Sequence, residues 1–293
     1  MALLPLSPGA RIGVFGPSGI HDPERLLASL EIVRGWGFDP VLAPHLGRRW
    51  RYLGGTDEER RADLEWALGD SSLDAAWLAR GGYGILRLLP HVRWDRVVPR
   101  PVVGFSDATA LFQAMHRRRI AGAIHGPVLH SLVDHADGTS RDAVRRLLLE
   151  GVAGPWRGTV LVAGRARGPL VGGNLCTLGS LAGTPDAIRA RGCILLLEEV
   201  AEAPYRVDRL LAQLVASGAL DGVKGVALGS FVECEAPAGE GWSLMDVVLD
   251  HLGPLGVPVV VDLPVGHGGR NCAFVHGAEA VLEEGVLAFA AHP

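Results

Sequence analysis

The sequence predicts an α/β protein of two domains, in which the first holds a parallel sheet flanked by helices and the second is smaller. In the N-terminal half, short apolar runs alternate with segments of helical periodicity, which is the pattern of parallel β-α-β units. The chain of 293 residues is longer than one typical domain, and its 48% hydrophobic content can fill two cores. Glycine and proline then interrupt the helical pattern near the middle of the chain.

Each predicted element of the first half depends on a local pattern. The strands are short apolar runs that end at glycine or serine, and the helices carry apolar residues at helical spacing. A capping box opens the second helix, because Thr56 precedes Glu59 by three positions. In chain order we expect a strand at Arg11–Phe15, helices at Asp22–Trp36 and Thr56–Leu68, strands at Ala75–Leu78 and Val102–Phe105, and helices at Asp107–Met115 and Ser140–Leu149.

A boundary between the two domains is expected where six glycines and prolines follow the last of these helices. We therefore expect an N-terminal α/β domain at 1–150, a linker at 151–168 and a C-terminal domain at 169–293. No repeat of fixed period is present, which disfavours a solenoid. The second domain is expected to contain a Gly-rich turn at Val171–Leu175, a strand at Ile194–Leu197, a helix at Tyr205–Val215, and strands at Val223–Leu228 and Val259–Val261.

Composition excludes several classes of protein. The formal charge of −4 comes from 28 basic and 32 acidic residues mixed along the chain, so no basic surface for nucleic acid is expected. The sequence contains no run of 18 apolar residues, so no membrane span is expected. Pro5 interrupts the apolar start, where a secretory signal would lie. We expect a cytoplasmic protein with four reduced cysteines, since none of them forms a C-x-x-C pair.

The segment Gly104–Thr109 places Ser106 between a predicted buried strand and the start of a helix. A sharp turn at this point exposes a serine hydroxyl, and the free N–H groups of the first helical turn can stabilise an oxyanion. The match to the G-x-S-x-G pattern is incomplete, because Ala108 stands where that pattern has glycine. The alternative interpretation is that Ser106 simply caps the helix.

Further candidates follow other predicted strands. The turn Gly81–Gly84 lets backbone approach a ligand closely or is a plain tight turn, and it lacks the full G-x-G-x-x-G phosphate pattern. Glu198 and Glu199 follow an apolar strand, so one of them can face a site while the other faces away. His267 lies between glycines and is a candidate general base.

No metal site or organic cofactor is expected. Three histidines recur every five positions, at His125, His130 and His135, and this spacing does not put two ligands on one face of a helix.

Taken together, these segments resemble the L,D-carboxypeptidase family of serine peptidases, which includes the murein tetrapeptide carboxypeptidases and the microcin C immunity hydrolases. The resemblance spans nearly the whole chain. It is carried, in order, by GPSG at 16–19, RGGYG at 80–84, GFSDAT at 104–109, HGP at 125–127, GGNL at 172–175, LLLEEVAEAPYRVDR at 195–209 and GHGGRN at 266–271. The chain departs from the family pattern at Cys272–Gly277, where an apolar strand and a proline-containing turn are usual.

The resemblance implies a catalytic triad of Ser106 as nucleophile, His267 as general base and acid, and Glu198 as the group that orients the imidazole. It also implies an oxyanion hole from the backbone N–H groups of Gly82 and Asp107, a site in the cleft between the domains, and a homodimer. These roles agree with triad chemistry in general.

The leading functional hypothesis is therefore a hydrolase that removes the terminal D-alanine from murein tetrapeptides. Such an enzyme must bind a free carboxylate, and Arg80 and Asn174 are the candidates for that task. The alternatives are a hydrolase of peptidyl-nucleotide antibiotics, as in the microcin-type relatives, and a non-catalytic α/β protein that binds a small molecule.

Overall fold

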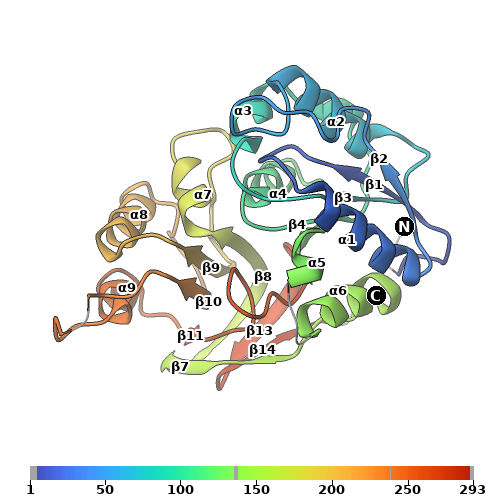
Figure 1. The fold of residues 1–293 in the computed structure, drawn as a ribbon. Helices are drawn as coiled ribbons and strands as arrows, with labels where there is room; N and C mark the ends of the chain where they lie inside the picture. The colour runs from blue at the N-terminus through green and yellow to red at the C-terminus, as the bar shows by residue number, and fades with distance from the viewer. Residues whose placement is uncertain (1–4, 135–137, 238, 291–293) are drawn as a thin grey trace. The chain divides into compact units, whose positions relative to one another are not determined.

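The structure is a computed structural model that describes residues 5–134, 138–237 and 239–290. The chain forms two compact units (Figure 1). The first contains Ala153 and the residues before it, together with Cys272–Val275. The second contains Gly154–Asn271 and the stretch that begins at His276.

The first unit is built on a six-stranded sheet with the order β12-β5-β4-β3-β1-β2. Five of the strands are parallel to their neighbours, and only β12 is antiparallel to β5. The central strands are wholly buried, as expected for a parallel sheet covered on both faces. The strands are β1 (Arg11–Phe15), β2 (Asp39–Leu42), β3 (Ala75–Leu78), β4 (Val102–Gly104), β5 (Ala123–His125) and β12 (Phe274–Val275).

Helices cover both faces of this sheet. Helices α1, α5 and α6 pack on one face through a shared apolar cluster that includes Leu30, Leu132 and Leu147. Trp66 of α2 lies near Gly13 of β1, and Ala108 of α4 lies near Gly104 of β4, on the other face. The helices are α1 (Pro23–Gly35), α2 (Asp57–Gly69), α3 (Ile85–Leu88), α4 (Ala108–Arg117), α5 (Ser131–Asp134) and α6 (Thr139–Glu150), with 3-10 turns at Leu89–His91 and Trp94–Arg96.

The second unit has an eight-stranded sheet with the order β6-β14-β13-β8-β9-β10-β11-β7. Strands β8 to β11 are parallel, and the flanking strands pair antiparallel. The strands are β6 (Trp156–Arg157), β7 (Thr159–Val162), β8 (Arg165–Asn174), β9 (Ile194–Val200), β10 (Gly225–Val232), β11 (Val259–Val261), β13 (Glu279–Glu283) and β14 (Val286–Phe289).

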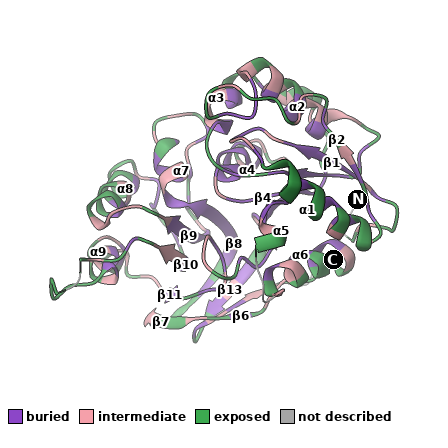
Figure 2. Cartoon of the chain, in the orientation of Figure 1, coloured by how far each residue is buried: buried purple, intermediate pink, exposed green. Residues whose placement is uncertain are grey.

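Its helices are α7 (Leu175–Ser180), α8 (Pro204–Ala216) and α9 (Leu244–Leu252), followed by a 3-10 turn at Gly253–Leu255. Their apolar faces pack on the parallel strands, where Leu211 and Val248 join Leu195 and Leu197 in one buried cluster. Strands β9 and β11 are almost wholly buried, whereas β7 at the edge of the sheet and the outer faces of the helices are more exposed (Figure 2). In the described part of the chain, no helix is both long and apolar enough to span a membrane.

Two expectations for the middle of the chain are wrong. The stretch 151–168 is not a linker, because it holds β6, β7 and the beginning of β8. Likewise, 171–175 is not a separate turn, since β8 continues to Asn174. A Cβ atom on Gly172 would lie 2.1 Å from the Leu196 carbonyl oxygen, so here glycine permits close strand packing.

The C-terminal boundary also differs from the expectation. The first four residues of the divergent segment, Cys272–Val275, belong to the first unit, where Phe274 and Val275 pair with His125 and Ile124 of β5. Those two residues form the antiparallel edge of the first sheet.

Candidate active site

Ser106 lies on a strained turn at the end of β4. Its φ of 63° is in the left-handed region, which a non-glycine residue adopts at a cost of about 1–2 kcal/mol. Helix α4 begins two residues later, at Ala108. This is the strand-to-helix geometry that displays a nucleophile.

Small residues make this turn sterically possible. A Cβ atom on Gly104 would lie 2.9 Å from the Ala108 Cβ and 3.0 Å from a methyl group of Leu78. Gly104 and Ala108 therefore share one small space. Because Gly104 has no side chain, the methyl group of Ala108 fits where the G-x-S-x-G pattern has glycine.

Ser106 does not cap helix α4. The N-cap residue is Asp107, and no side chain makes a capping hydrogen bond there. Within the described part of the first unit, no hydrogen bond involves the Ser106 Oγ. The structure thus disfavours the interpretation of Ser106 as a simple cap.

The turn at 81–84 approaches Ser106 closely. A Cβ atom on Gly81 would lie 3.1 Å from the Ser106 Cβ and 3.3 Å from its Oγ. Gly82 has a φ of 117° and follows directly, and the Gly81 carbonyl accepts a hydrogen bond from the Gly19 N–H at 3.2 Å. The GPSG turn, the RGGYG turn and the serine turn are therefore adjacent within the first unit.

The second unit holds an acid and a histidine in direct contact. The Nδ1 of His267 lies 2.7 Å from the Oε2 of Glu198, which is fully buried in β9. A carboxylate can only accept, so Nδ1 carries the proton and Nε2 is left as the basic atom. Burial lowers the pKa of His267, but the hydrogen bond to Glu198 and the charges of Glu198 and Glu199 outweigh it and raise that pKa.

Two residues that sequence reasoning did not single out hold the loop that carries His267. The Asn271 Oδ1 accepts a hydrogen bond from the Gly266 N–H at 3.1 Å, and the Ser230 Oγ accepts one from the Gly268 N–H at 2.9 Å. Ser230 comes from β10, 38 positions away, so only the fold brings it to the loop. Asn271 could have been found, because it closes the GHGGRN motif.

A cavity of about 540 Å³ borders the same loop within the second unit. Its lining includes Gly268, Gly269 and Arg270 from the loop, together with Ser230 and Trp242. This volume lies in the range of small-molecule pockets.

Glu199 and Asn174 support the fold on the other side of β9. The Glu199 carboxylate accepts hydrogen bonds from Asn174 Nδ2 at 2.8 Å, from Cys176 N at 2.6 Å and from Val200 N at 2.9 Å. Asn174 also caps helix α7, where its Oδ1 accepts from the Thr177 N–H. The amide group of Asn174 is thus engaged inside the second unit, which does not favour the predicted role in substrate binding.

Arg80 remains a candidate for binding an anion. Its side chain is exposed, and its guanidinium donates to the Ile20 carbonyl oxygen. Among the described residues it forms no ion pair with a carboxylate. The charge of Arg80 is therefore not neutralised within the part of its unit that the structure describes.

The histidines with five-residue spacing have separate environments. The ring of His125 is buried in β5 and stacks on Phe274 with a centroid distance of 5.1 Å. His130 is buried near His21, and His135 lies outside the described residues. In the described ranges, no group of three or more His, Cys, Asp or Glu side chains could hold a metal ion.

Both units of the chain match known protein families. Residues 12–126 match the LD-carboxypeptidase N-terminal domain family, and residues 167–282 match the LD-carboxypeptidase C-terminal domain family. A protein of Synechocystis sp. is 42% identical over 98% of this chain and 96% of its own. The murein tetrapeptide carboxypeptidase of Pseudomonas aeruginosa is 36% identical over 93% of each chain.

Among solved structures, the muramoyltetrapeptide carboxypeptidase from Oxalobacter formigenes has a TM-score of 0.86. Its sequence is 26% identical, and the match covers 95% of this chain and 97% of that one. Similarity in sequence thus extends along both units, and similarity in fold accompanies it. The chain belongs to the LD-carboxypeptidase family and is a serine-type carboxypeptidase.

Proposed function

We propose that this protein removes the terminal D-alanine from murein tetrapeptides during cell-wall recycling, with Ser106, His267 and Glu198 as its triad. The observation that carries the proposal is the strained backbone of Ser106 at the end of β4, with φ at 63°. Such strain at a strand-to-helix turn serves the display of a side chain. The names of the relatives from Pseudomonas and Oxalobacter support the choice of substrate.

In the proposed first step, His267 Nε2 takes the proton of the Ser106 hydroxyl as its Oγ attacks the carbonyl carbon before the D-alanine. The backbone N–H groups of Gly82 and Asp107 donate to the oxyanion that forms. When the C–N bond breaks, the imidazolium gives its proton to the departing amine of D-alanine. Glu198 accepts from Nδ1, holds the tautomer and stabilises the imidazolium.

In the second step, a water molecule attacks the ester that joins the peptide to Ser106. His267 takes a proton from the water and then returns it to the Ser106 Oγ as the ester bond breaks. The tripeptide leaves with a new carboxylate, and the enzyme returns to its starting state. No other group is needed for this proton balance.

Arg80 is proposed to bind the terminal carboxylate of the substrate. It directly precedes the Gly81–Gly82 turn, and no carboxylate of the described part of the chain pairs with it. If so, amidation of the terminal D-alanine lowers kcat/KM sharply, because a charged group loses its partner at a cost of about 1–3 kcal/mol or more. Equal cleavage of the free acid and the amide would exclude a carboxypeptidase that reads this carboxylate.

The experiment that tests the proposal is mass spectrometry of murein tri-, tetra- and pentapeptides after incubation with the protein. We expect only the tetrapeptide to lose one alanine, and Ser106→Ala to abolish the reaction. A peptidyl-nucleotide substrate forms a second arm, and its cleavage without cleavage of the tetrapeptide would favour the antibiotic-hydrolase alternative. A wild-type protein that neither cleaves these substrates nor reacts with a fluorophosphonate at Ser106 would be a binding protein.

A further inference from the structure

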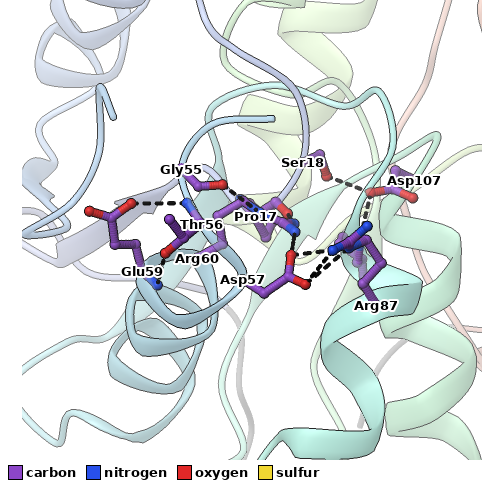
Figure 3. Close-up of polar contacts among 10 residues, drawn as sticks. Pro17, Ser18, Gly55, Thr56, Asp57, Glu59, Arg60, Arg87 and Asp107 are labelled. Atoms are coloured by element: carbon purple, nitrogen blue, oxygen red, sulfur yellow. Dashed lines mark hydrogen bonds and ion pairs between the residues drawn. The ribbon is translucent and has the colours of Figure 1, made fainter. Parts of the chain in front are cut away.

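The buried carboxylate of Asp107 joins two turns beside Ser106. Its Oδ2 accepts a hydrogen bond from Ser18 Oγ at 2.6 Å (Figure 3). The same oxygen accepts a second hydrogen bond from the Ile85 backbone N–H at 3.0 Å. Ser18 belongs to the GPSG turn, and Ile85 directly follows the RGGYG turn. Asp107 itself follows the nucleophile, and only 4% of it is exposed. One oxygen atom therefore connects three separate turns.

The buried guanidinium of Arg60 contacts the same two turns, at the residues that directly precede Ser18 and Ile85. Arg60 of α2 is 1% exposed, and its guanidinium donates to the carbonyl oxygens of Pro17 and, at 3.3 Å, of Gly55 (Figure 3). A Cβ atom on Gly84 would lie 2.5 Å from the Arg60 Nη1, so the guanidinium lies directly against that glycine. Arg60 thus binds Pro17 and contacts Gly84, and Asp107 accepts hydrogen bonds from the residues that follow these two, Ser18 and Ile85.

Burial of two such charges opposes folding unless their hydrogen bonds are well formed. Burial raises the pKa of Asp107, while the hydrogen bond from Ser18 and the charge of Arg60 act in the opposite direction. The carboxylate that pairs with Arg60 is Asp57 and not Asp107. Apolar side chains in place of Arg60 and Asp107 would avoid the cost of burying charge. Apolar side chains could not fix the directions of backbone groups, as Arg60 does for the Pro17 carbonyl and Asp107 does for the Ile85 N–H.

We propose that the Asp107 side chain is a positioning group for the oxyanion site, which it aligns by holding the Ser18 and Ile85 turns against the turn of Ser106. The inference deepens the proposed function, on which it depends, by giving the side chain of Asp107 a task separate from that of its backbone N–H. Because Gly82 lies three residues before Ile85, a shift of Ile85 moves the donor of Gly82. Loss of the carboxylate should then weaken binding of the transition state more than binding of the substrate.

The test compares Asp107→Ala, Asp107→Asn and Ser18→Ala with the wild-type chain. Removing one oxyanion donor typically lowers kcat by about 10²–10³-fold, so we expect Asp107→Ala to lower kcat about 10²-fold, with KM changed by less than about threefold. Asp107→Asn keeps an oxygen that can accept both hydrogen bonds but has no charge, so its kcat should lie between those of Asp107→Ala and the wild type. Ser18→Ala removes one of the two bonds and should give a smaller loss.

Matched controls come from buried groups of the same unit that do not touch these turns. Asp63 is a buried carboxylate that accepts hydrogen bonds from the backbone N–H and the ring Nδ1 of His45. Ser29 is a buried hydroxyl that donates to the Leu129 carbonyl oxygen at 2.7 Å. Asp63→Asn and Ser29→Ala should change kcat by less than about twofold per folded molecule, with the folded fraction measured by urea denaturation.

A second measurement, which needs no murein peptide, is the rate at which a fluorophosphonate labels Ser106. This rate reports on the oxyanion site because the labelling reaction also develops charge on an oxygen there. We expect Asp107→Ala to slow labelling at least tenfold relative to Asp63→Asn. Wild-type labelling without tetrapeptide cleavage would refute the proposed substrate but leave this inference to be decided by the labelling rates. The inference would be overturned if Asp107→Ala and the wild type were labelled at equal rates. It would also be overturned if Asp107→Ala raised KM and left kcat unchanged. If Asp107→Ala does not fold, Ser18→Ala against Ser29→Ala decides the question by the same two measurements.

Discussion

Neighbouring acids on β9 should separate catalysis from stability. Glu198 contacts His267 and Glu199 contacts Asn174, because successive side chains of a strand point to opposite faces. In Glu198→Gln, the amide oxygen can still accept from His267 Nδ1, but no charge remains to stabilise the imidazolium. By comparison with replacement of a triad acid in other serine enzymes, kcat should fall about 10³–10⁴-fold. The free energy of unfolding should change by only about 1 kcal/mol or less, because the hydrogen bond and the packing are retained.

Glu199→Gln should have the opposite profile. Both oxygens of Glu199 accept hydrogen bonds, from Asn174, Cys176 and Val200. Glutamine has one oxygen, so its NH2 group faces an N–H donor in either orientation, and at least one hydrogen bond to a buried charge is lost. The free energy of unfolding should fall by about 1.5–3 kcal/mol, whereas kcat per folded molecule should change less than about tenfold.

The assay combines steady-state cleavage of the murein tetrapeptide with urea denaturation of both variants and the wild type. Both measurements are needed, because a loss of folded protein alone also lowers the apparent rate. If Glu199→Gln lost more kcat than Glu198→Gln, the acid of the triad would be shifted by one position. If Glu198→Gln kept more than one tenth of the wild-type kcat, the proposed role of Glu198 would be refuted.

Three more predictions concern the nucleophile, the base and metal ions. Ser106→Ala and Ser106→Gly should both be inactive in the tetrapeptide assay. The free energy of unfolding of Ser106→Gly, measured in urea, should exceed that of the wild type by about 1 kcal/mol, because glycine adopts a φ of 63° without strain. Equal free energies of unfolding would argue against backbone strain at Ser106. The pKa of His267 is raised above 6.5, so the neutral imidazole that acts as base is lost as the pH falls through that pKa. We therefore expect kcat/KM to decline at acid pH, and Glu198→Gln to move this decline to lower pH. A pH profile that Glu198→Gln leaves unchanged would contradict this prediction. Prolonged treatment with a strong chelator should leave turnover unchanged, and a loss of turnover that zinc restores would contradict metal-independent triad chemistry.

Strands with plain apolar runs were predictable from the sequence, and so was the turn that follows β4. β1, β3 and β11 have the predicted bounds, and the capping box of Thr56 opens α2 as expected. In these segments a local pattern is enough, because a buried parallel strand needs a short run of apolar residues wherever it lies. The structure adds that Ser106 itself has the left-handed backbone conformation.

A strand without a plain apolar run, β8, was not predicted from the sequence. β8 contains four glycines and prolines within RARGPLVGGN, a composition that suggests a linker and a turn. Its glycines serve close contact with a neighbouring segment instead, since a Cβ atom on Gly168 would lie 2.3 Å from the carbonyl oxygen of Gly192 in the turn before β9. That reason lies in a partner segment 24 positions away, which no local pattern reports.

By itself, the sequence determined the α/β class, the resemblance to L,D-carboxypeptidases and the candidate residues of the proposed triad. The resemblance already implied that Glu198 orients His267. Only the tertiary structure decided that Ser230 holds the histidine loop and that the Asp107 carboxylate joins Ser18 to Ile85. The physical reason is the range of the interactions. Strand and helix patterns come from neighbours in the chain, whereas a buried hydrogen bond depends on the direction and distance of groups that folding alone brings together.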